Sequence, residues 1–225
     1  MSFRKVGGAA AGFALALAWT AGTAPASAQT VARVESAVAV FDEVMSMGDK
    51  SIPIDLLKKA QCVAIVPGLK KGAIVVGGKY GRGFVSCRKD GGWSAPAGIR
   101  IEGGSFGFQI GGTEIDVILA IMNTRGVNRL LSNQFTLGAD ASVAAGPVGR
   151  TAAAQTDLAM TAEILSWSRS RGVFAGVAVD GATLRGDADA NLDLYGKRLE
   201  TRTIVTGDTP VPPGGRALIE RLSKY

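Results

Sequence analysis

Short β-rich runs separated by glycines fill the chain from residue 62 to about residue 112, and no other feature constrains the fold as strongly. The runs are CVAIV, AIVVGG, GFVSCR, WSAPAGIRIE and SFGFQIGG. Runs of this length and composition, bounded by glycine, are typical of strands, and they predict antiparallel strands in close succession. The segment GKYGRG (residues 78–83) is predicted to be a tight hairpin turn that displays Lys79 and Arg82.

Helices are predicted mainly outside this β-rich region. Apolar residues recur at steps of three and four over residues 31–47, which predicts an amphipathic helix. Shorter helices are expected at residues 54–60, 124–131, 189–195 and 216–222, and further strands at residues 114–122, 139–145, 161–167 and 173–179. Because few long helices separate the strands, a doubly wound parallel sheet is disfavoured. The predicted fold class is α+β, with a glycine-rich, strongly curved or barrel-like antiparallel sheet and a few short helices.

The first 28 residues have the pattern of an export signal. Arg4 and Lys5 precede a charge-free run over residues 6–19, and Ala26-Ser27-Ala28 supplies a small-x-small cleavage pattern before Gln29. The apolar run is shorter than the roughly 20 residues that a helix needs to span a bilayer. We therefore expect cleavage and export to the periplasm; an uncleaved signal anchor is the alternative.

The chain contains no histidine and two cysteines. Histidine-based triads, Cys-His dyads and His-containing metal sites are therefore excluded, and two cysteines alone cannot complete a tetrahedral zinc site. We expect no enzyme activity, no cofactor and no metal site. The remaining enzyme alternative is an acid pair, with Glu102 or Glu114 paired with Asp116. Glu114 and Asp116 would share one face of a strand.

The two cysteines, Cys62 and Cys87, are an even pair in a protein expected to be exported. A disulfide is permitted in an oxidising compartment if the two residues are cross-strand neighbours. The alternative is that both are small buried hydrophobic residues.

The apolar side of the predicted 31–47 helix carries Val34, Val38, Phe41 and Met45. Such a helix could face a membrane and insert these side chains. A stripe with this period also packs commonly against its own domain, and the polar side of this helix is acidic as well as basic. Both arrangements stay open.

Positive charge is concentrated early in the domain. Between residues 58 and 89 there are eight basic residues and no acidic one: Lys58, Lys59, Lys70, Lys71, Lys79, Arg82, Arg88 and Lys89. Lys and Arg clustered without acids attract phosphate-bearing surfaces such as an anionic membrane. Nucleic acid also carries phosphates that would attract these cations, but the expected export argues against nucleic acid as the partner. The alternative is that these cations only keep the protein soluble.

Four segments in this order resemble the SYLF-domain family: CVAIVPGLKKGAIVVGGKYGRGFVSCR, GGWSAPAGIRIEGGSFGFQIGGTEIDVILAIM, LGADASVAAGPVGR and SWSRSRGVFAGVAVDGATLRGD. The resemblance covers nearly all of residues 35–196, within a single domain expected over residues 29–225 whose C-terminal extension is residues 197–225. It implies a lipid-binding domain, known in eukaryotic members for phosphoinositide binding and in fungal members for actin association.

The resemblance makes Lys70, Lys71, Lys79 and Arg82 the expected contacts to lipid headgroups. An exported bacterial member is not expected to meet actin or cytosolic phosphoinositides, so anionic phospholipid, lipopolysaccharide phosphates or another envelope component are the expected partners. The predicted function is non-catalytic binding of anionic lipid headgroups or a membrane surface. The alternative is an envelope structural or protein-interaction module that binds no lipid directly.

Overall fold

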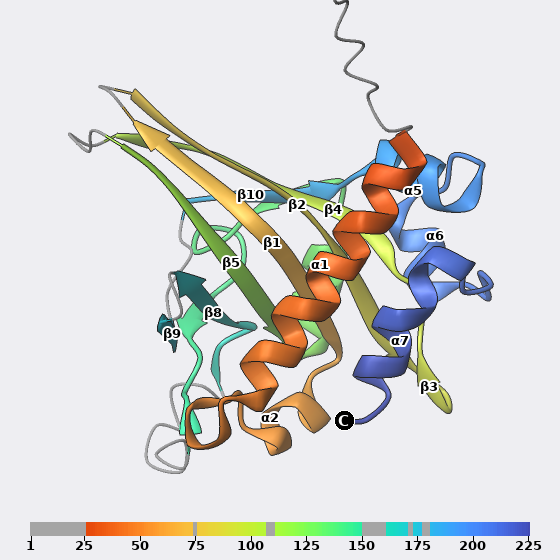
Figure 1. The fold of residues 1–225 in the computed structure, drawn as a ribbon, viewed down its shortest axis with the longest axis horizontal. Coiled ribbons are helices and arrows are strands. Elements are labelled where there is room, and N and C mark those ends of the chain that lie inside the picture. The colour runs from red at the N-terminus through yellow and green to blue at the C-terminus, as the bar shows by residue number, and fades with distance from the viewer. Residues whose placement is uncertain (1–25, 74–75, 107–110, 150–160, 171–172, 177–180) are drawn as a thin grey trace, which may run out of the picture.

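The computed structural model describes residues 26–225, apart from residues 74–75, 107–110, 150–160, 171–172 and 177–180. Within the described residues, ten strands form one curled, open sheet that resembles half a barrel (Figure 1). The strands are β1 (Cys62–Ala73), β2 (Val76–Lys89), β3 (Gly92–Trp93), β4 (Ala97–Phe106), β5 (Gly111–Ile121), β6 (Gln134–Thr136), β7 (Val143–Ala145), β8 (Ile164–Ser170), β9 (Val173–Gly176) and β10 (Thr183–Gly186). The predicted α+β class with a strongly curved sheet is confirmed.

The four longest strands form the centre of the sheet. The full order is β6-β10-β4-β2-β1-β5-β8-β7, with β3 paired to β2 and β9 paired to β8. Neighbouring strands are antiparallel except β7 and β8, which are parallel. The β-rich region therefore folds as the antiparallel succession that its glycine-separated runs predict.

Helices pack on both faces of this sheet, and the first, longest helix crosses one of them (Figure 1). They are α1 (Ala26–Ser46), α2 (Ile54–Lys59), α3 (Thr124–Leu130), α5 (Ala188–Tyr195), α6 (Thr201–Thr206) and α7 (Arg216–Leu222), with 3₁₀ turns η1 (Gly48–Lys50) and η3 (Pro213–Gly215). α7 lies beside α1, where Phe41 and Tyr225 make an edge-to-face contact at 5.7 Å between ring centroids. The amphipathic helix predicted over residues 31–47 is confirmed and begins earlier, at Ala26.

The two faces of the sheet bury two apolar cores. On the face covered by α1, which we call the α1 face, Phe84, Ile118 and Trp167 pack against residues of α1 that include Val34 and Phe41. On the opposite face, which we call the inner face, the buried residues come from the central strands together with α3, β6 and α6. Alternate residues along each central strand therefore serve different cores, as the period of a strand requires.

The GKYGRG segment is strand and not the predicted hairpin turn, which corrects that prediction. Its residues lie inside β2 and pair with β1 and β4. A β-bulge in β1, between Ile65 and Lys70, lies against this part of β2. A Cβ on Gly83 would overlap the carbonyl oxygen of Ile65, and a Cβ on Gly81 would overlap the Leu69 side chain. These two glycines therefore permit close approach of the bulge.

Three predicted helices begin at or within one residue of their predicted first residue. α3 begins after Asn123, whose Oδ1 accepts a hydrogen bond from Gly126 N at 2.9 Å. α5 begins after Asp187, whose Oδ1 accepts from Ala190 N at 3.1 Å. α2 begins directly after Pro53. α6, by contrast, was not anticipated from the sequence.

The predicted export signal lies largely outside the described residues, since residues 1–25 are not among them. The expected cleavage point before Gln29 falls in the first turn of α1. Among the described residues, no helix is both long enough and apolar enough to cross a membrane.

Candidate functional site

The four cations expected to contact headgroups lie on two faces of the sheet. Lys70 is opposite Tyr80, and Lys71 is opposite Lys79; directly opposed residues point to the same side of a sheet. Side chains alternate between the two faces along a strand. Lys70 and Arg82 occupy the same alternate positions as the residues that pack beneath α1, so they belong to the α1 face. Lys71 and Lys79 belong to the inner face. The structure therefore brings these residues together in two pairs and not in one patch.

The inner-face pair, Lys71 and Lys79, forms a concentrated positive site. Burial, and after it the charge of Lys79, lowers the pKa of Lys71. Like charges directly opposite one another destabilise a sheet. The pair lies toward the end of the long β1 and β2 strands, which project away from the helices (Figure 1). This arrangement holds two ammonium groups close together at an extremity of the molecule.

Arg82 is engaged in a buried ion pair. Its Nε donates to Asp187 Oδ2 and its Nη2 donates to Asp187 Oδ1 at 2.8 Å. Burial would raise the pKa of Asp187, but the hydrogen bonds from Arg82 and from the backbone of Ala190 outweigh burial, so this pKa is lowered. The hydrogen bond to Asp187 also raises the pKa of Arg82. Arg82 therefore joins β2 to the start of α5, and its charge is largely offset.

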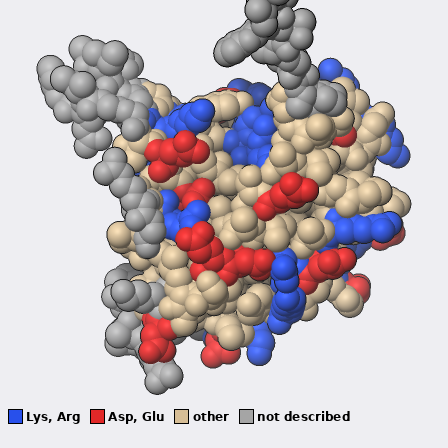
Figure 2. All heavy atoms as spheres, in the orientation of Figure 1, with Lys and Arg blue, Asp and Glu red and all other residues tan. Residues whose placement is uncertain are grey.

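Arg82 is also one of three arginines in a row across neighbouring strands. Arg82 of β2 is opposite Arg100 of β4, and Arg100 is opposite Arg185 of β10. Arg33 of α1 lies near enough to this row for the charge of Arg82 to lower its pKa. We call Arg33, Arg82, Arg100 and Arg185 the arginine cluster. Figure 2 shows Lys and Arg atoms gathered beside the N-terminal half of α1, over these strands.

Glu102 is the second carboxylate of the arginine cluster, beside Asp187. Its Oε1 lies 3.0 Å from Arg100 Nε, and its Oε2 forms an ion pair with Arg185 Nη2. The contact to Arg100 Nε is close enough for an ion pair but lacks hydrogen-bond geometry, because that nitrogen is buried without a hydrogen-bond partner in the described part of the chain. Two guanidinium groups thus share one carboxylate.

The surroundings of Arg33 disfavour its positive charge. Burial lowers its pKa, the positive charge of Arg82 lowers it further, and the nearby Asp187 and Asp193 compensate only in part. Its Nη1, like the Nε of Arg185, is buried without a hydrogen-bond partner among the described residues. Neither nitrogen therefore has a protein acceptor among the described residues.

A cleft of about 610 Å³ separates the N-terminal half of α1 from the bulge of β1 and from β5 and β8. Arg33 lines it on the helix side, and Glu114, Asp116 and Arg169 line it on the sheet side. Arg169 Nη2 lies 2.6 Å from Asp116 Oδ2, and its Nη1 forms an ion pair with Glu43 of α1. Asp116, one of the acid pair considered for an enzyme, is therefore part of an ion-pair network that ties α1 to the sheet.

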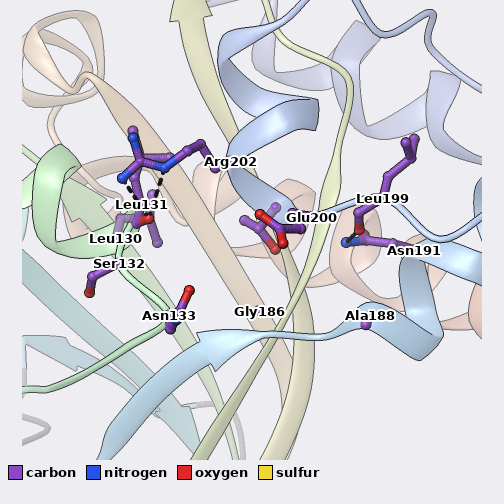
Figure 3. Close-up of a pocket in the computed structure, with 11 residues that line it drawn as sticks. Leu130, Leu131, Ser132, Asn133, Gly186, Ala188, Asn191, Leu199, Glu200 and Arg202 are labelled. Carbon is purple, nitrogen blue, oxygen red and sulfur yellow. Dashed lines mark hydrogen bonds between the residues drawn. The ribbon is translucent and has the colours of Figure 1, made fainter.

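A smaller pocket of about 170 Å³ lies between α3, α5 and α6 (Figure 3). Arg202 and Asn191 lie on opposite sides of it, and each points to a backbone carbonyl. Arg202 Nη2 donates to Leu131 O at 3.0 Å, and Asn191 Nδ2 donates to Leu199 O at 2.9 Å. Both side chains hydrogen-bond backbone carbonyls beside the helices. This structural role accounts for the two polar side chains in the pocket without a ligand.

The apolar residues considered for membrane insertion are covered by the domain in this structure. Val34 and Phe41 are fully buried, and Val38 and Met45 pack at the margin of the same core. The helix thus adopts the docked arrangement of the two that the sequence leaves open.

Cys62 and Cys87 are cross-strand partners on β1 and β2 and form a disulfide. Both are buried. Of the two alternatives left open by the sequence, the structure contains the disulfide.

Sequence reasoning missed three members of the arginine cluster, namely Arg33, Arg100 and Arg185. Arg100 and Glu102 are two residues apart, so their shared face was foreseeable once the strand was predicted. Their meeting with Arg33 and Arg185 was not, because it depends on β10 pairing with β4 and on α1 crossing that face.

The fold and this charged face describe a glycine-rich α+β domain with a curled sheet and a covering helix. A family profile described as "Ysc84: Las17-binding protein actin regulator" matches residues 102–225. The chain belongs to this family, which is the SYLF family that its motifs resemble.

Among the relatives is Protein YSC84 of Saccharomyces cerevisiae, which is 36% identical over 77% of this chain and 38% of its own length. LAS seventeen-binding protein 3 of the same species is 37% identical over 73% of this chain and 37% of its own length. Human SH3 domain-containing YSC84-like protein 1 is 34% identical over 82% of this chain and 55% of its own length. The chain thus spans about two fifths to just over half the length of these relatives.

Proposed function

We propose that this protein binds anionic lipid headgroups at a membrane surface, without catalysing a reaction, and that it does so in the periplasm after export. The observation that carries the proposal is the direct cross-strand opposition of Lys71 and Lys79. The pKa of Lys71 is lowered by burial and by Lys79, so the folded protein holds this charge at a cost. A negatively charged surface would relieve that cost.

The position of the pair also supports the proposal. The β1 and β2 strands project from the body of the molecule, so their lysines can reach a surface without displacing the helices (Figure 1). Lys70 precedes Lys71 on the same strand and is exposed. Because Lys70 lies on the α1 face and Lys71 and Lys79 lie on the inner face, one bilayer would meet all three only at the strand ends, edge-on to the sheet. Each Lys near an anionic membrane contributes about 1 kcal/mol, so in that orientation the three lysines together offer about 3 kcal/mol.

A protein partner is the second candidate. The description of the matched family profile and the name of one relative, LAS seventeen-binding protein 3, both refer to binding of Las17. By that likeness, this chain would act as an interaction module and would contact a protein of the cell envelope. Binding through an apolar interface would depend little on salt, whereas binding to lipid charge would weaken as salt rises.

Cosedimentation with vesicles tests the proposal. The full chain is expressed in a bacterium and purified from the periplasm, and its mass shows whether residues 1–28 have been removed. Binding is then measured with phosphatidylcholine vesicles that contain increasing phosphatidylglycerol, at low and high salt. We expect binding that rises with phosphatidylglycerol and falls with salt.

The matched variants are K70Q/K71Q/K79Q and, as control, K58Q/K59Q/K197Q, which removes the same charge from exposed lysines elsewhere. The first is expected to weaken binding on the order of 100-fold, from about 1 kcal/mol per lysine, and the second by a few-fold. Equal losses of vesicle affinity in the two variants would show that binding depends on the net charge of the protein and not on the lysines of the strand ends. Absence of vesicle binding under every condition would refute the lipid function and favour the protein partner.

A further inference from the structure

We propose that the disulfide between Cys62 and Cys87 is an exchange site that a small thiol opens through a pocket of the native fold, and that its reduction releases helix α7. The inference goes beyond the proposed function and does not depend on which ligand the domain binds. It rests on three observations. Both cysteines line a pocket, they join the strands at the end of a ladder, and the residue after Cys87 holds other segments in place.

The disulfide borders a pocket of about 180 Å³ between α3 and the end of α6. Val127 of α3 and Val205 of α6 form two of its walls. One water needs roughly 10–15 Å³ of such space, so the reactive end of a small thiol fits. Cys87 is 6% exposed and Cys62 is 0% exposed. Attack by the thiol is therefore expected at Sγ of Cys87.

The cysteine pair lies at the end of the β1–β2 ladder, where Cys62 is the first residue of β1. The backbone of Cys87 bonds away from β1, because its oxygen accepts from Ser94 N at 2.7 Å and its N–H donates to Ser94 Oγ at 3.0 Å. Cys62 and Cys87 are thus a cross-strand pair of the non-hydrogen-bonded type. Beyond them, Arg88 N donates to Gln61 O at 2.7 Å. Opening the disulfide therefore removes the direct connection between the strands at this position.

The exchange balances as two successive attacks by a thiolate. The first thiolate attacks Sγ of Cys87, the protein S–S bond breaks, and Sγ of Cys62 leaves with the electron pair as a thiolate. A second thiolate attacks the external sulfur of the mixed disulfide, which frees the Cys87 thiolate and forms the disulfide of the small thiol. Both cysteine thiolates then take protons from water. Two thiol molecules are thereby oxidised, and the protein disulfide gains their two electrons.

Arg88, the residue after the second cysteine, joins other segments on the opposite face of the sheet. Its Nη2 donates to Leu57 O of α2 at 3.1 Å and to Tyr225 O, beyond α7, at 3.0 Å. Its Nε donates to Ala60 O at 3.1 Å. We call these contacts the Arg88 clamp. Because Arg88 directly follows the disulfide on β2, the clamp depends on the ladder end that the disulfide closes.

The Arg88 clamp continues to α1 through Tyr225. The Tyr225 ring contacts Phe41 of α1 edge-to-face, at 5.7 Å between centroids. Arg221 Nε of α7 also lies 2.9 Å from Asp42 Oδ2 of α1, but these side chains are 40% and 44% exposed, and such ion pairs contribute little. We therefore expect reduction to loosen α7 from α1 before it disturbs the central strands.

Thiol exchange in the folded protein tests the pocket. The purified, oxidised full chain is incubated with 2-mercaptoethanol, quenched with iodoacetamide at intervals and digested for mass spectrometry. We expect the first mixed disulfide on Cys87, with Cys62 alkylated. The exchange rate should change less than about twofold with urea below the unfolding transition, because local opening does not require global unfolding.

A matched pair of substitutions tests whether the thiol enters through the pocket. V127F adds a ring to the pocket wall and is expected to slow exchange on the order of tenfold, since access limits thiol–disulfide exchange. V173F adds the same ring at a position that is 69% exposed and is expected to leave the rate unchanged. Overpacking destabilises a fold, so exchange that proceeds by global unfolding would instead become faster in V127F.

Hydrogen exchange of the α7 amides tests the release of this helix. Reduction of the wild type with dithiothreitol is expected to speed exchange in residues 216–225 at least about tenfold, while β5 keeps its protection. R88Q should show the same loss while it is still oxidised. R125Q, which changes an arginine of α3 whose side chain is 79% exposed, should show none. C62A/C87A should match the reduced wild type and should not respond to dithiothreitol.

The outcomes separate the two parts of the inference. Exchange at Cys87 in the native protein, together with loss of α7 protection on reduction, supports it. Exchange that follows the unfolding curve in urea, or that is faster in V127F, overturns the exchange site. Unchanged α7 protection in both the reduced wild type and C62A/C87A overturns the release of α7, and this comparison decides if circular dichroism shows that R88Q does not fold. No vesicle enters these measurements, so their failure leaves the proposed function intact.

Discussion

Replacement of Asp187 by Asn removes a negative charge from the buried contact between β2 and α5 while it keeps the size of the side chain. The Asp187 side chain is 0% exposed and binds two nitrogens of Arg82. Its Oδ1 also caps α5 through Ala190 N. Because Asn caps helices as well as Asp does, the cap is retained and the change isolates the ion pair.

The expected loss follows from the burial of the pair. Removing one partner of a buried ion pair costs about 3–5 kcal/mol, because the other charge is left without compensation. Arg82 is 25% exposed and can recover part of its hydration, so the lower end applies. We expect Asp187→Asn to lower the free energy of unfolding by about 3 kcal/mol, and the unfolding midpoint by about 6–12 °C for a domain of this size.

The pH dependence gives a second, independent signature. The pKa of Asp187 is lowered in the folded state, so its contribution is fully present above the pKa of an unfolded Asp, about 3.9, and is lost as the pH falls through the folded pKa. The difference in stability between wild type and Asp187→Asn should therefore be constant between about pH 5 and pH 8 and shrink below about pH 4.

Urea denaturation followed by circular dichroism, repeated from pH 3 to pH 8, measures both effects. Asp208→Asn is the matched control, since Asp208 pairs with Lys89 at 2.6 Å but is fully exposed, and no resolvable loss is expected. A loss below about 1 kcal/mol for Asp187→Asn, or a difference that does not change with pH, would refute the buried-pair argument.

Two further changes test the packing of β1 against β2. The double change Cys62→Ala and Cys87→Ala opens a disulfide that closes a separation of 25 residues, and it should lower the free energy of unfolding by about 2–4 kcal/mol in non-reducing urea titrations. Gly83→Ala places a Cβ against the carbonyl oxygen of Ile65, so the strands must shift, and we expect a loss of about 1–3 kcal/mol in the same assay.

Each of these changes has its own check. Reducing agent should destabilise the wild type but leave the double cysteine variant unchanged; equal sensitivity in both would contradict the role of the disulfide. Gly104→Ala on β4 is the control for Gly83→Ala, because a Cβ at Gly104 meets no atom within 4 Å. A similar loss of unfolding free energy at both glycines would show that the loss comes from a general effect of replacing glycine in a strand and not from the close approach of the bulge at Gly83.

Local signals in the sequence were sufficient for most elements. The apolar spacing of residues 31–47 identified α1, and the helix predicted over residues 124–131 is α3. The glycine-separated runs identified the central strands, because the residue composition of each short run is by itself typical of a strand. These signals are local, so they survive without knowledge of the partner strand.

Local signals failed where distant segments decide the outcome. GKYGRG resembles a turn, yet it continues β2 because its glycines accommodate the bulge of β1. Arg82 appears in the sequence as a free cation, yet it is neutralised by Asp187, 105 residues later. Charge counted along the chain could not reveal this, since the neutralising residue lies outside the basic segment.

The sequence therefore determined the family, the α+β class, the main elements and the basic β1–β2 region, because all of these depend on residue order and local spacing. Only the tertiary structure decided which cations share a face, which are paired and which are left with unsatisfied donors. Strand alternation separates Lys70 from Lys71 although they are adjacent. The pairing of β10 with β4 and the crossing of α1 bring Arg33, Arg100 and Arg185 together although they are far apart in the chain. Electrostatic interactions depend on distance in space, and the fold alone sets those distances.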